Sequence, residues 1–234
     1  MSATSTPATI SRGADHAVRP GAGLRLLRAG VLAFFRNGLC VPHVIGREHV
    51  PASPFVLCAN HRSHLDSLAL ICGLRLEDKC ALLAARDYFE QGGATRRLLA
   101  LPFTVIPVER RYPGVAMLGT IAAAAAFFRQ GGQVLIAYPE GTRQTGGTIA
   151  PFKRGAATLA LALGRPVLPV FIDGTERLLP KGRHIPIRGP VTLTLGPAIQ
   201  PGTRPDAGQW HDRSRDLIRS IEASVRGLAG TNAA

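Results

Sequence analysis

The sequence predicts a single α/β domain built on a mostly parallel or mixed sheet that helices cover, with an amphipathic helix near the N-terminus. Short apolar runs typical of buried strands alternate with longer helical patterns, and this alternation implies crossover connections between parallel strands. The chain has 234 residues, a length that single domains of this class often reach. Hydrophobic residues make up 46% of it, enough for a substantial core.

The N-terminal part of the chain divides into two segments. Residues 1–20 are rich in Ser, Thr and Ala and lack the apolar run of a secretory signal, so we expect a disordered leader. Residues 21–45 contain a basic amphipathic helix with Arg25, Arg28 and Arg36 on one face. Its apolar face is formed by Leu24, Leu27, Val31, Phe34 and Phe35. Two interpretations stay open: the helix packs on its own domain, or it lies on a membrane with its arginines at the lipid headgroups.

Residues 46–230 are predicted to form the main domain. Strands are expected at apolar runs bounded by turn residues, and helices where apolar residues recur at helical spacing. In chain order the expected elements are a strand at 55–59, a helix at 63–74, strands at 80–84 and 103–108, a helix at 114–130, a strand at 133–138, a helix at 155–163, strands at 167–172 and 191–195, and a closing helix at 210–228.

Charge and cysteine usage limit the classes of function. A net charge of +13 calls for an anionic partner or surface. The basic residues occur in pairs, without a long Lys/Arg block or a zinc-finger pattern, so lipid is favoured over nucleic acid. The four cysteines form no C-x-x-C pair, which indicates free thiols in a reducing compartment. The longest uncharged stretch, residues 112–128, is short for a membrane-spanning helix, so the chain is not expected to span a membrane.

A first candidate site lies where the strand at 55–59 passes into the next helix. His61 is followed five residues later by Asp66, and such residues are far out of phase on a regular helix. A bend at the strand exit would let Asp66 bind one imidazole nitrogen and leave the other as a proton acceptor. A competing interpretation is a capping-box-like spacing between Ser63 and Asp66, in which the carboxylate only satisfies backbone donors. His61 and His64 have no matching cluster of further ligands, so no metal site is expected.

A second candidate site follows the strand at 133–138. Gly141 allows close approach of the backbone to a ligand, and Arg143 can pair with a phosphate. Cations recur at other strand exits and helix entries, at Arg110 and at Lys153. An anion bound there would also meet helix N-terminal amides.

Four ordered blocks between about residues 45 and 200 make the chain resemble the glycerophospholipid acyltransferase family. The blocks are Asn60-His61-x-Ser63-x-x-Asp66, Val108-Glu109-Arg110, Tyr138-Pro139-Glu140-Gly141-Thr142-Arg143 and Val167-Leu168-Pro169-Val170. Two positions differ from the usual pattern: Glu109 stands in place of Asp, and Tyr138 in place of Phe.

The resemblance implies an O-acyltransferase that moves an acyl group from acyl-CoA or acyl-carrier protein to the free hydroxyl of a lysophospholipid, without a cofactor. The favoured acceptor is 1-acylglycerol-3-phosphate, which gives phosphatidic acid; a phosphate-free acceptor such as lyso-ornithine lipid is the alternative. The resemblance also implies that His61 is the general base and that Asp66 is its orienting partner. The substrate-binding residues are Arg110, Glu140, Gly141, Thr142, Arg143 and Lys153, with the two arginines at the acceptor's phosphate.

An enzyme whose acceptor is a lipid has a reason to lie on a membrane, so the resemblance favours the membrane interpretation of the basic helix. We expect the enzyme to be peripheral or monotopic at the cytoplasmic face of an anionic membrane. Two other functions stay open. One is a basic protein that binds membranes without catalysis, and the other is a thioesterase that uses the same His61 and Asp66 pair to activate water.

Overall fold

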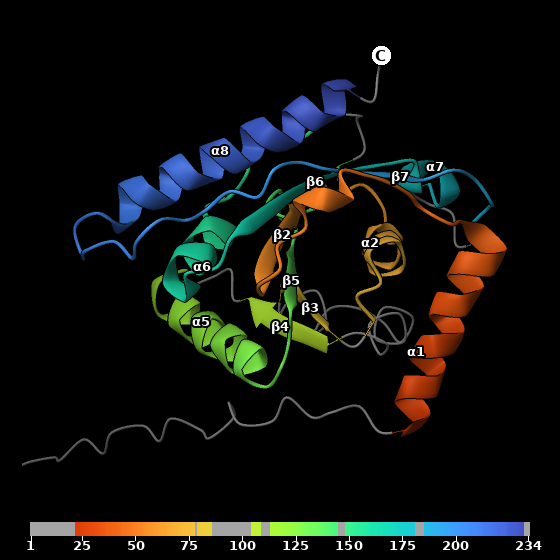
Figure 1. Ribbon diagram of the computed structural model, residues 1–234, viewed down its shortest axis with the longest axis horizontal. Coiled ribbons are helices and arrows are strands. Elements are labelled where there is room, and N and C mark those ends of the chain that lie inside the picture. The colour runs from red at the N-terminus through yellow and green to blue at the C-terminus, as the bar shows by residue number, and fades with distance from the viewer. Residues whose placement is uncertain are drawn as a thin grey trace, which may run out of the picture.

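The computed structural model describes residues 22–77, 79–85, 104–108, 113–144, 148–180 and 185–231, which fold around one seven-stranded sheet (Figure 1). The strands are β1 (His43–Ile45), β2 (Phe55–Ala59), β3 (Cys80–Ala85), β4 (Thr104–Val108), β5 (Val134–Ala137), β6 (Val167–Asp173) and β7 (Thr192–Leu195). The helices are α1 (Ala22–Phe34), continued by the π-helix η1 (Phe35–Leu39), the 3-10 turn η2 (Arg47–His49), α2 (Asp66–Leu74), α5 (Pro113–Arg129), α6 (Gly155–Leu163), α7 (Thr175–Leu178) and α8 (Trp210–Thr231).

The sheet is mixed, with its strands in the order β1-β7-β6-β2-β5-β3-β4. Strands β6, β2, β5, β3 and β4 are parallel to one another, whereas β7 is antiparallel to β6 and carries β1 parallel to itself. The predicted α/β class with a mostly parallel or mixed sheet is therefore confirmed. The carboxyl ends of β2, β5 and β6 lie at one edge of the sheet, where open α/β sheets place their ligands.

Successive side chains of the central strands enter two different cores. Phe55 and Leu57 of β2 pack with residues of α2 and η1, while Val56 and Cys58 pack with residues of α5, α6 and α8. Figure 1 shows the same division, with α5, α6 and α8 on one side of the sheet and α1 and α2 on the other. Because both faces of β2 are covered, its five residues are all buried, and the strand is apolar without alternation.

Two of the differences between the predicted and the observed bounds matter most for the fold. Residues 43–45 belong to the sheet as β1, which pairs with β7, although the sequence placed them in the N-terminal helical segment. A three-residue strand carries too little pattern to be recognised without its partner. Helix α2 begins at Asp66 and not at Ser63, because the backbone N–H groups of Arg62 and Ser63 donate to the Asp66 carboxylate at 2.8 and 2.9 Å and hold a turn there.

Helix α1 forms where it was predicted, but the assignment of Arg28 to its polar face was wrong. Arg28, expected on the polar face, is only 4% exposed and points toward the domain, where its Nη2 donates to Cys80 Sγ at 3.8 Å. Leu26 and Phe34 are 75% and 63% exposed. Helix α1 packs through Leu32, whose carbonyl accepts from the Cys72 thiol of α2. The described side chains that α1 exposes are therefore apolar.

Among the helices of the described residues, none is long and apolar enough to cross a membrane.

Candidate active site

The first site is built on a bend that Asn60 fixes at the carboxyl end of β2. Its buried side chain bonds the backbone of Ile172 twice: Nδ2 donates to the carbonyl at 2.9 Å, and Oδ1 accepts from the amide at 2.7 Å. These two bonds continue the β2–β6 ladder through a side chain. The backbone after Asn60 can therefore leave the direction of β2, while the Asn60 side chain keeps this point bonded to β6.

His61 and Asp66 are in direct contact. The distance from His61 Nδ1 to Asp66 Oδ2 is 2.8 Å, the His61 side chain is 22% exposed, and that of Asp66 is fully buried. A carboxylate oxygen can accept a hydrogen bond from an Nδ1–H group, and in that tautomer the other ring nitrogen, Nε2, keeps its lone pair. The geometry that a base and its orienting partner require is present, and it depends on the bend that the residue spacing demanded.

Asp66 caps the bend as well. Its Oδ2 accepts from His61 and from the amides of Arg62 and Ser63, while its Oδ1 accepts a short hydrogen bond from the hydroxyl of Thr175 on α7. The two interpretations that the sequence left open are thus compatible: one carboxylate satisfies backbone donors and holds the imidazole. Ser63 does not cap α2; its Oγ accepts from the amide of Leu65 inside the turn.

Tyr138 supports the imidazole from the loop that follows β5. Its ring stacks on that of His61 with centroids 4.1 Å apart and planes at 16°, and its hydroxyl shares a 2.9 Å hydrogen bond with Ser67 of α2. Burial raises the pKa of the Tyr138 phenol well above its usual range, and the charge of Asp66 adds to this, while the Ser67 bond opposes it. The phenol is therefore neutral and holds the plane of the imidazole.

Glu140 shapes the site through the backbone. It is 3% exposed, and its two oxygens accept from the amides of His61 at 2.7 Å and Ala150 at 2.8 Å. Burial raises the pKa of its carboxyl, although these two hydrogen bonds lower it. The His61 carbonyl in turn accepts from the amide of Gln144 at 2.9 Å. Glu140 belongs to the third block of the sequence and His61 to the first. The hydrogen bonds of the Glu140 carboxylate to the backbone therefore join these two blocks.

Gly141 occupies a position that no other residue would fill without strain. Its φ of +76° lies in the left-handed region, and a Cβ there would lie 2.8 Å from Lys153 Nζ. The amide of Lys153 donates to the carbonyl of Pro139 at 2.9 Å, which fixes the start of α6 beside the loop. Lys153 and Gly141, twelve residues apart in sequence, therefore share one corner of the site.

The other predicted substrate-binding residues differ in exposure and in hydrogen bonding. Arg143 is half-buried, and within the described part of the chain no hydrogen bond engages its guanidinium, which leaves it open to an anion. Thr142 is exposed, and its hydroxyl and carbonyl accept from the Gln144 side chain. Arg110 lies outside the described residues.

Three residues in the site were not predicted as functional: Asn60, Tyr138 and Thr175. The first two stand inside the recognised blocks, so their position was a signal, although nothing in the sequence showed that they hold His61. Thr175 lies 109 residues from Asp66 along the chain. Only the alignment of β6 beside β2 brings it there, and no local pattern predicts this.

No group of three or more potential metal ligands occurs among the described residues. The four cysteines are free, and three of them are buried. This matches the expectation of free thiols, and burial raises the pKa of Cys58 to about 12.

Comparisons with known proteins identify relatives of this chain. Residues 41–173 match the family model described as Acyltransferase. The chain is 32% identical over 215 residues to the 1-acyl-sn-glycerol-3-phosphate acyltransferase alpha of Mus musculus, covering 88% of this chain and 73% of that protein. It is 28% identical to the 1-acyl-sn-glycerol-3-phosphate acyltransferase of Pseudomonas aeruginosa, covering 67% of this chain and 58% of the relative.

The fold is also similar to a solved structure. The crystal structure of the 1-acyl-sn-glycerophosphate acyltransferase of Thermotoga maritima superposes with a TM-score of 0.59 at 25% sequence identity, over 91% of this chain and 79% of that one. The matched family region spans His61, Asp66 and the loop from Tyr138 to Arg143, and it ends before Thr175.

Proposed function

Since this chain belongs to the acyltransferase family, we propose that it transfers an acyl group from a thioester to the free hydroxyl of 1-acylglycerol-3-phosphate, giving phosphatidic acid. The observation that supports this most strongly is the contact between His61 Nδ1 and Asp66 Oδ2 at 2.8 Å, because it leaves Nε2 as the basic nitrogen of a partly exposed imidazole.

The reaction needs one proton acceptor and a correctly placed hydroxyl. His61 Nε2 takes the hydroxyl proton as the oxygen attacks the thioester carbonyl, and a carbon–oxygen bond forms. The tetrahedral intermediate then collapses, the carbon–sulfur bond breaks, and the imidazolium returns its proton to the leaving sulfur. Asp66 stabilises the imidazolium between the two steps. A thioester already carries a good leaving group, so the protein supplies no covalent nucleophile.

The acceptor's phosphate binds beside the third block in this proposal. Arg143 is half-buried without a hydrogen-bonding partner among the described residues, and Lys153 is exposed at the same corner. Two cations near the loop that Glu140 joins to His61 suit a substrate that carries its phosphate near the reacting hydroxyl. This favours 1-acylglycerol-3-phosphate over a phosphate-free acceptor such as lyso-ornithine lipid. Arg110 completes the phosphate site in the proposal.

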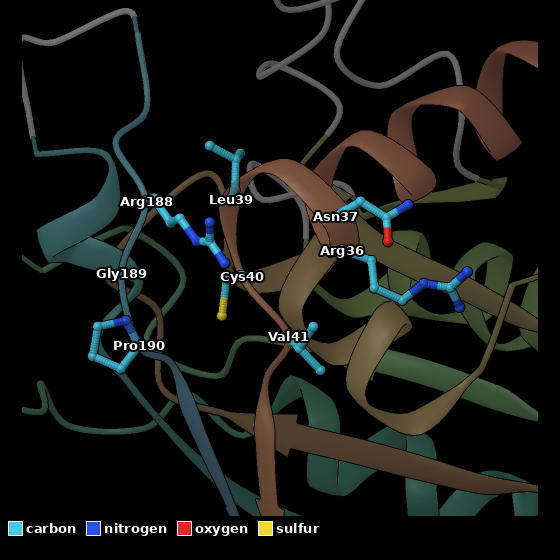
Figure 2. A pocket seen from close by; sticks show the side chains of 8 residues that line it. All are labelled: Arg36, Asn37, Leu39, Cys40, Val41, Arg188, Gly189 and Pro190. Carbon is cyan, nitrogen blue, oxygen red and sulfur yellow. The ribbon is translucent and has the colours of Figure 1, made fainter.

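A membrane surface is the proposed source of the lipid acceptor. The outer face of α1 exposes Leu26, Leu27 and Phe34, an arrangement typical of a helix that lies in an interface. A cavity of about 280 Å³ lies beside η1, which continues α1. Figure 2 shows the residues that line it, among them the exposed Val41 and Arg188. We propose peripheral or monotopic attachment at the cytoplasmic face, through these apolar groups and the net positive charge of the protein.

The test is release of thiol from acyl thioesters by purified protein, read together with lipid mass. We expect thiol release to require 1-acylglycerol-3-phosphate, and His61→Ala to abolish it in a protein with unchanged circular dichroism. Thiol release that needs no acceptor would indicate a thioesterase. Acylation of lyso-ornithine lipid alone would move the acceptor to the phosphate-free class, and binding to vesicles without any turnover would leave a non-catalytic membrane protein.

A further inference from the structure

Residues 185–190, which we call the strap, expose two isoleucines near the end of α1. Ile185 is 80% exposed and Ile187 is 50% exposed, and the strap forms neither a helix nor a strand. The Gly189 amide donates to the Leu39 carbonyl at 3.3 Å, which joins the strap to η1. The strap therefore extends the exposed apolar surface of α1, and an apolar surface that spans two segments marks an interaction site.

The inner side of the strap packs along helix α7. The Ile187 amide donates to the Leu178 carbonyl at 2.8 Å. A Cβ at Gly189 would lie 3.0 Å from the Leu178 side chain, and a Cβ at Gly174 would lie 2.4 Å from the Pro190 carbonyl oxygen. Helix α7 has only four residues, and a helix this short is not stable without tertiary contacts. The strap is therefore one of the elements that hold α7 in place.

Helix α7 in turn holds the carboxylate of the candidate active site. The Thr175 hydroxyl donates to Asp66 Oδ1, while Asp66 Oδ2 faces His61. At the other end of α7, the Leu179 carbonyl accepts from the Ser63 hydroxyl at 3.5 Å, within the bend that Asp66 caps. A shift of the strap would move α7, and with it the group that orients the Asp66 carboxylate.

Cations flank the apolar side chains of the strap. Arg188 of the strap and Arg36 of η1 line the cavity beside η1 together with the exposed Val41, and none of the described residues that line it is acidic. Among the described residues, no hydrogen bond or ion pair engages either guanidinium. Figure 2 shows the Arg36 side chain directed away from the strap, so the two charges are spread over a surface and do not clamp one small ion. Spread cations beside exposed apolar groups suit the headgroups of an anionic phospholipid bilayer.

We propose that the strap binds the surface of an anionic phospholipid bilayer through Ile185, Ile187 and Arg188, and that this contact controls the geometry at Asp66 through α7. The inference rests on the proposed function, because it concerns the regulation of the same site. A bilayer stabilises the position of the strap that places the isoleucines in the interface, so binding shifts the population toward that position. In the structure this is the position that holds α7. Acyl transfer is therefore fastest at the surface that contains the lipid acceptor.

The test uses a short-chain 1-acylglycerol-3-phosphate that stays monomeric in water, with and without vesicles of anionic phospholipid. We expect vesicles to raise the wild-type kcat about tenfold. In the double variant Ile185→Ser with Ile187→Ser, this rise should fall below about twofold, measured where sedimentation shows that all the protein is bound through α1. Leu118→Ser, which replaces an exposed apolar residue of α5, is the control that keeps the wild-type rise. An equal rise in the wild type and the double variant, once both are fully bound, overturns the inference.

Hydrogen–deuterium exchange of the full chain separates this inference from the proposed function, because it needs no turnover. The amides of Arg177, Leu178 and Leu179 are bonded within α7 or to Gly174 before it. We expect their exchange to slow about tenfold when the wild type binds vesicles, and to stay unchanged in the double variant. Exchange in α7 that vesicles leave unchanged in the wild type overturns the inference. Protection of α7 without transfer to any lysolipid contradicts the proposed function and leaves the link between the strap and α7 standing.

Discussion

The hydroxyl of Thr175 donates a hydrogen bond to Asp66 Oδ1, the carboxylate oxygen that His61 does not use. Thr175 is fully buried on α7, and its position is set by β6, which precedes it in the chain. One oxygen of Asp66 thus faces the imidazole while the other is held from the far side. We infer that Thr175 is a positioning residue that fixes the carboxylate plane.

Replacing Thr175 with Val keeps the shape and removes this hydrogen bond. We expect kcat to fall about tenfold to a hundredfold, since a hydrogen bond to a charged group contributes ~1.5–3 kcal/mol, while the KM values stay unchanged. Thr175→Ser should restore most of the activity. Steady-state kinetics of both variants check this, and equal losses in Val and Ser variants would contradict a role for the hydroxyl.

Asp66→Asn should cost more, because Asp66 serves the imidazole and the bend together. An amide offers one accepting oxygen where the carboxylate offers two, so at least one of the four donors loses its partner. We expect kcat to fall about 10²- to 10⁴-fold. Thermal unfolding should show a loss of roughly 1–3 kcal/mol for the unpaired buried group. Full activity in a protein of lowered stability would show that Asp66 only caps the bend.

Gly141→Ala should impair the site through a close contact as well as through backbone strain. The left-handed φ of +76° costs an L-residue about 1–2 kcal/mol, and the new methyl group would displace the Lys153 side chain. Gly131→Ala is a matched control, since Gly131 has a φ of +93° and no atom near its Cβ position. We expect similar losses of stability in both variants, with a rise in the lysolipid KM in Gly141→Ala alone.

Tyr138→Phe should change the alkaline stability while sparing the chemistry. Phe retains the stacking on His61 and loses the bond to Ser67, which costs about 1 kcal/mol at neutral pH. The pKa of Tyr138 is raised in the folded protein above its ordinary 10.0, so the unfolded state loses this proton first as the pH rises. Wild-type stability should therefore fall above pH 10 relative to Tyr138→Phe. Denaturant unfolding at pH 8 to 11 checks the sign, and parallel curves for the two proteins would contradict it.

The outer face of α1 can be tested by charge insertion. Leu26→Asp combined with Phe34→Asp should reduce sedimentation with anionic phospholipid vesicles at least tenfold, because both side chains are exposed and a buried carboxylate is costly in an interface. Leu118→Asp is the control: this residue of α5 is 68% exposed on the other side of the sheet. Equal losses in the two proteins would point to charge alone, and unchanged binding in the double variant would remove α1 from the membrane contact.

The sequence by itself determined the strands and helices whose patterns are local. The strand at Phe55–Ala59 and the helix at Gly155–Leu163 have the predicted bounds, because each is a continuous apolar run closed by turn residues. The spacing of His61 and Asp66 also required a bend, since residues five apart do not meet on a helix. The bend and the contact are present, while the catalytic roles stay predictions.

Only the tertiary structure decided which distant groups meet at that bend. Asn60 reaches Ile172, Thr175 reaches Asp66, and Tyr138 stacks on His61 because β6 and β5 flank β2. The face of α1 was also decided by packing: the helix is apolar on more than one side, so burial of Arg28 at Cys80 turned Leu26 outward. Local periodicity fixes the elements, whereas the order of the strands and the competition for buried surface fix their neighbours.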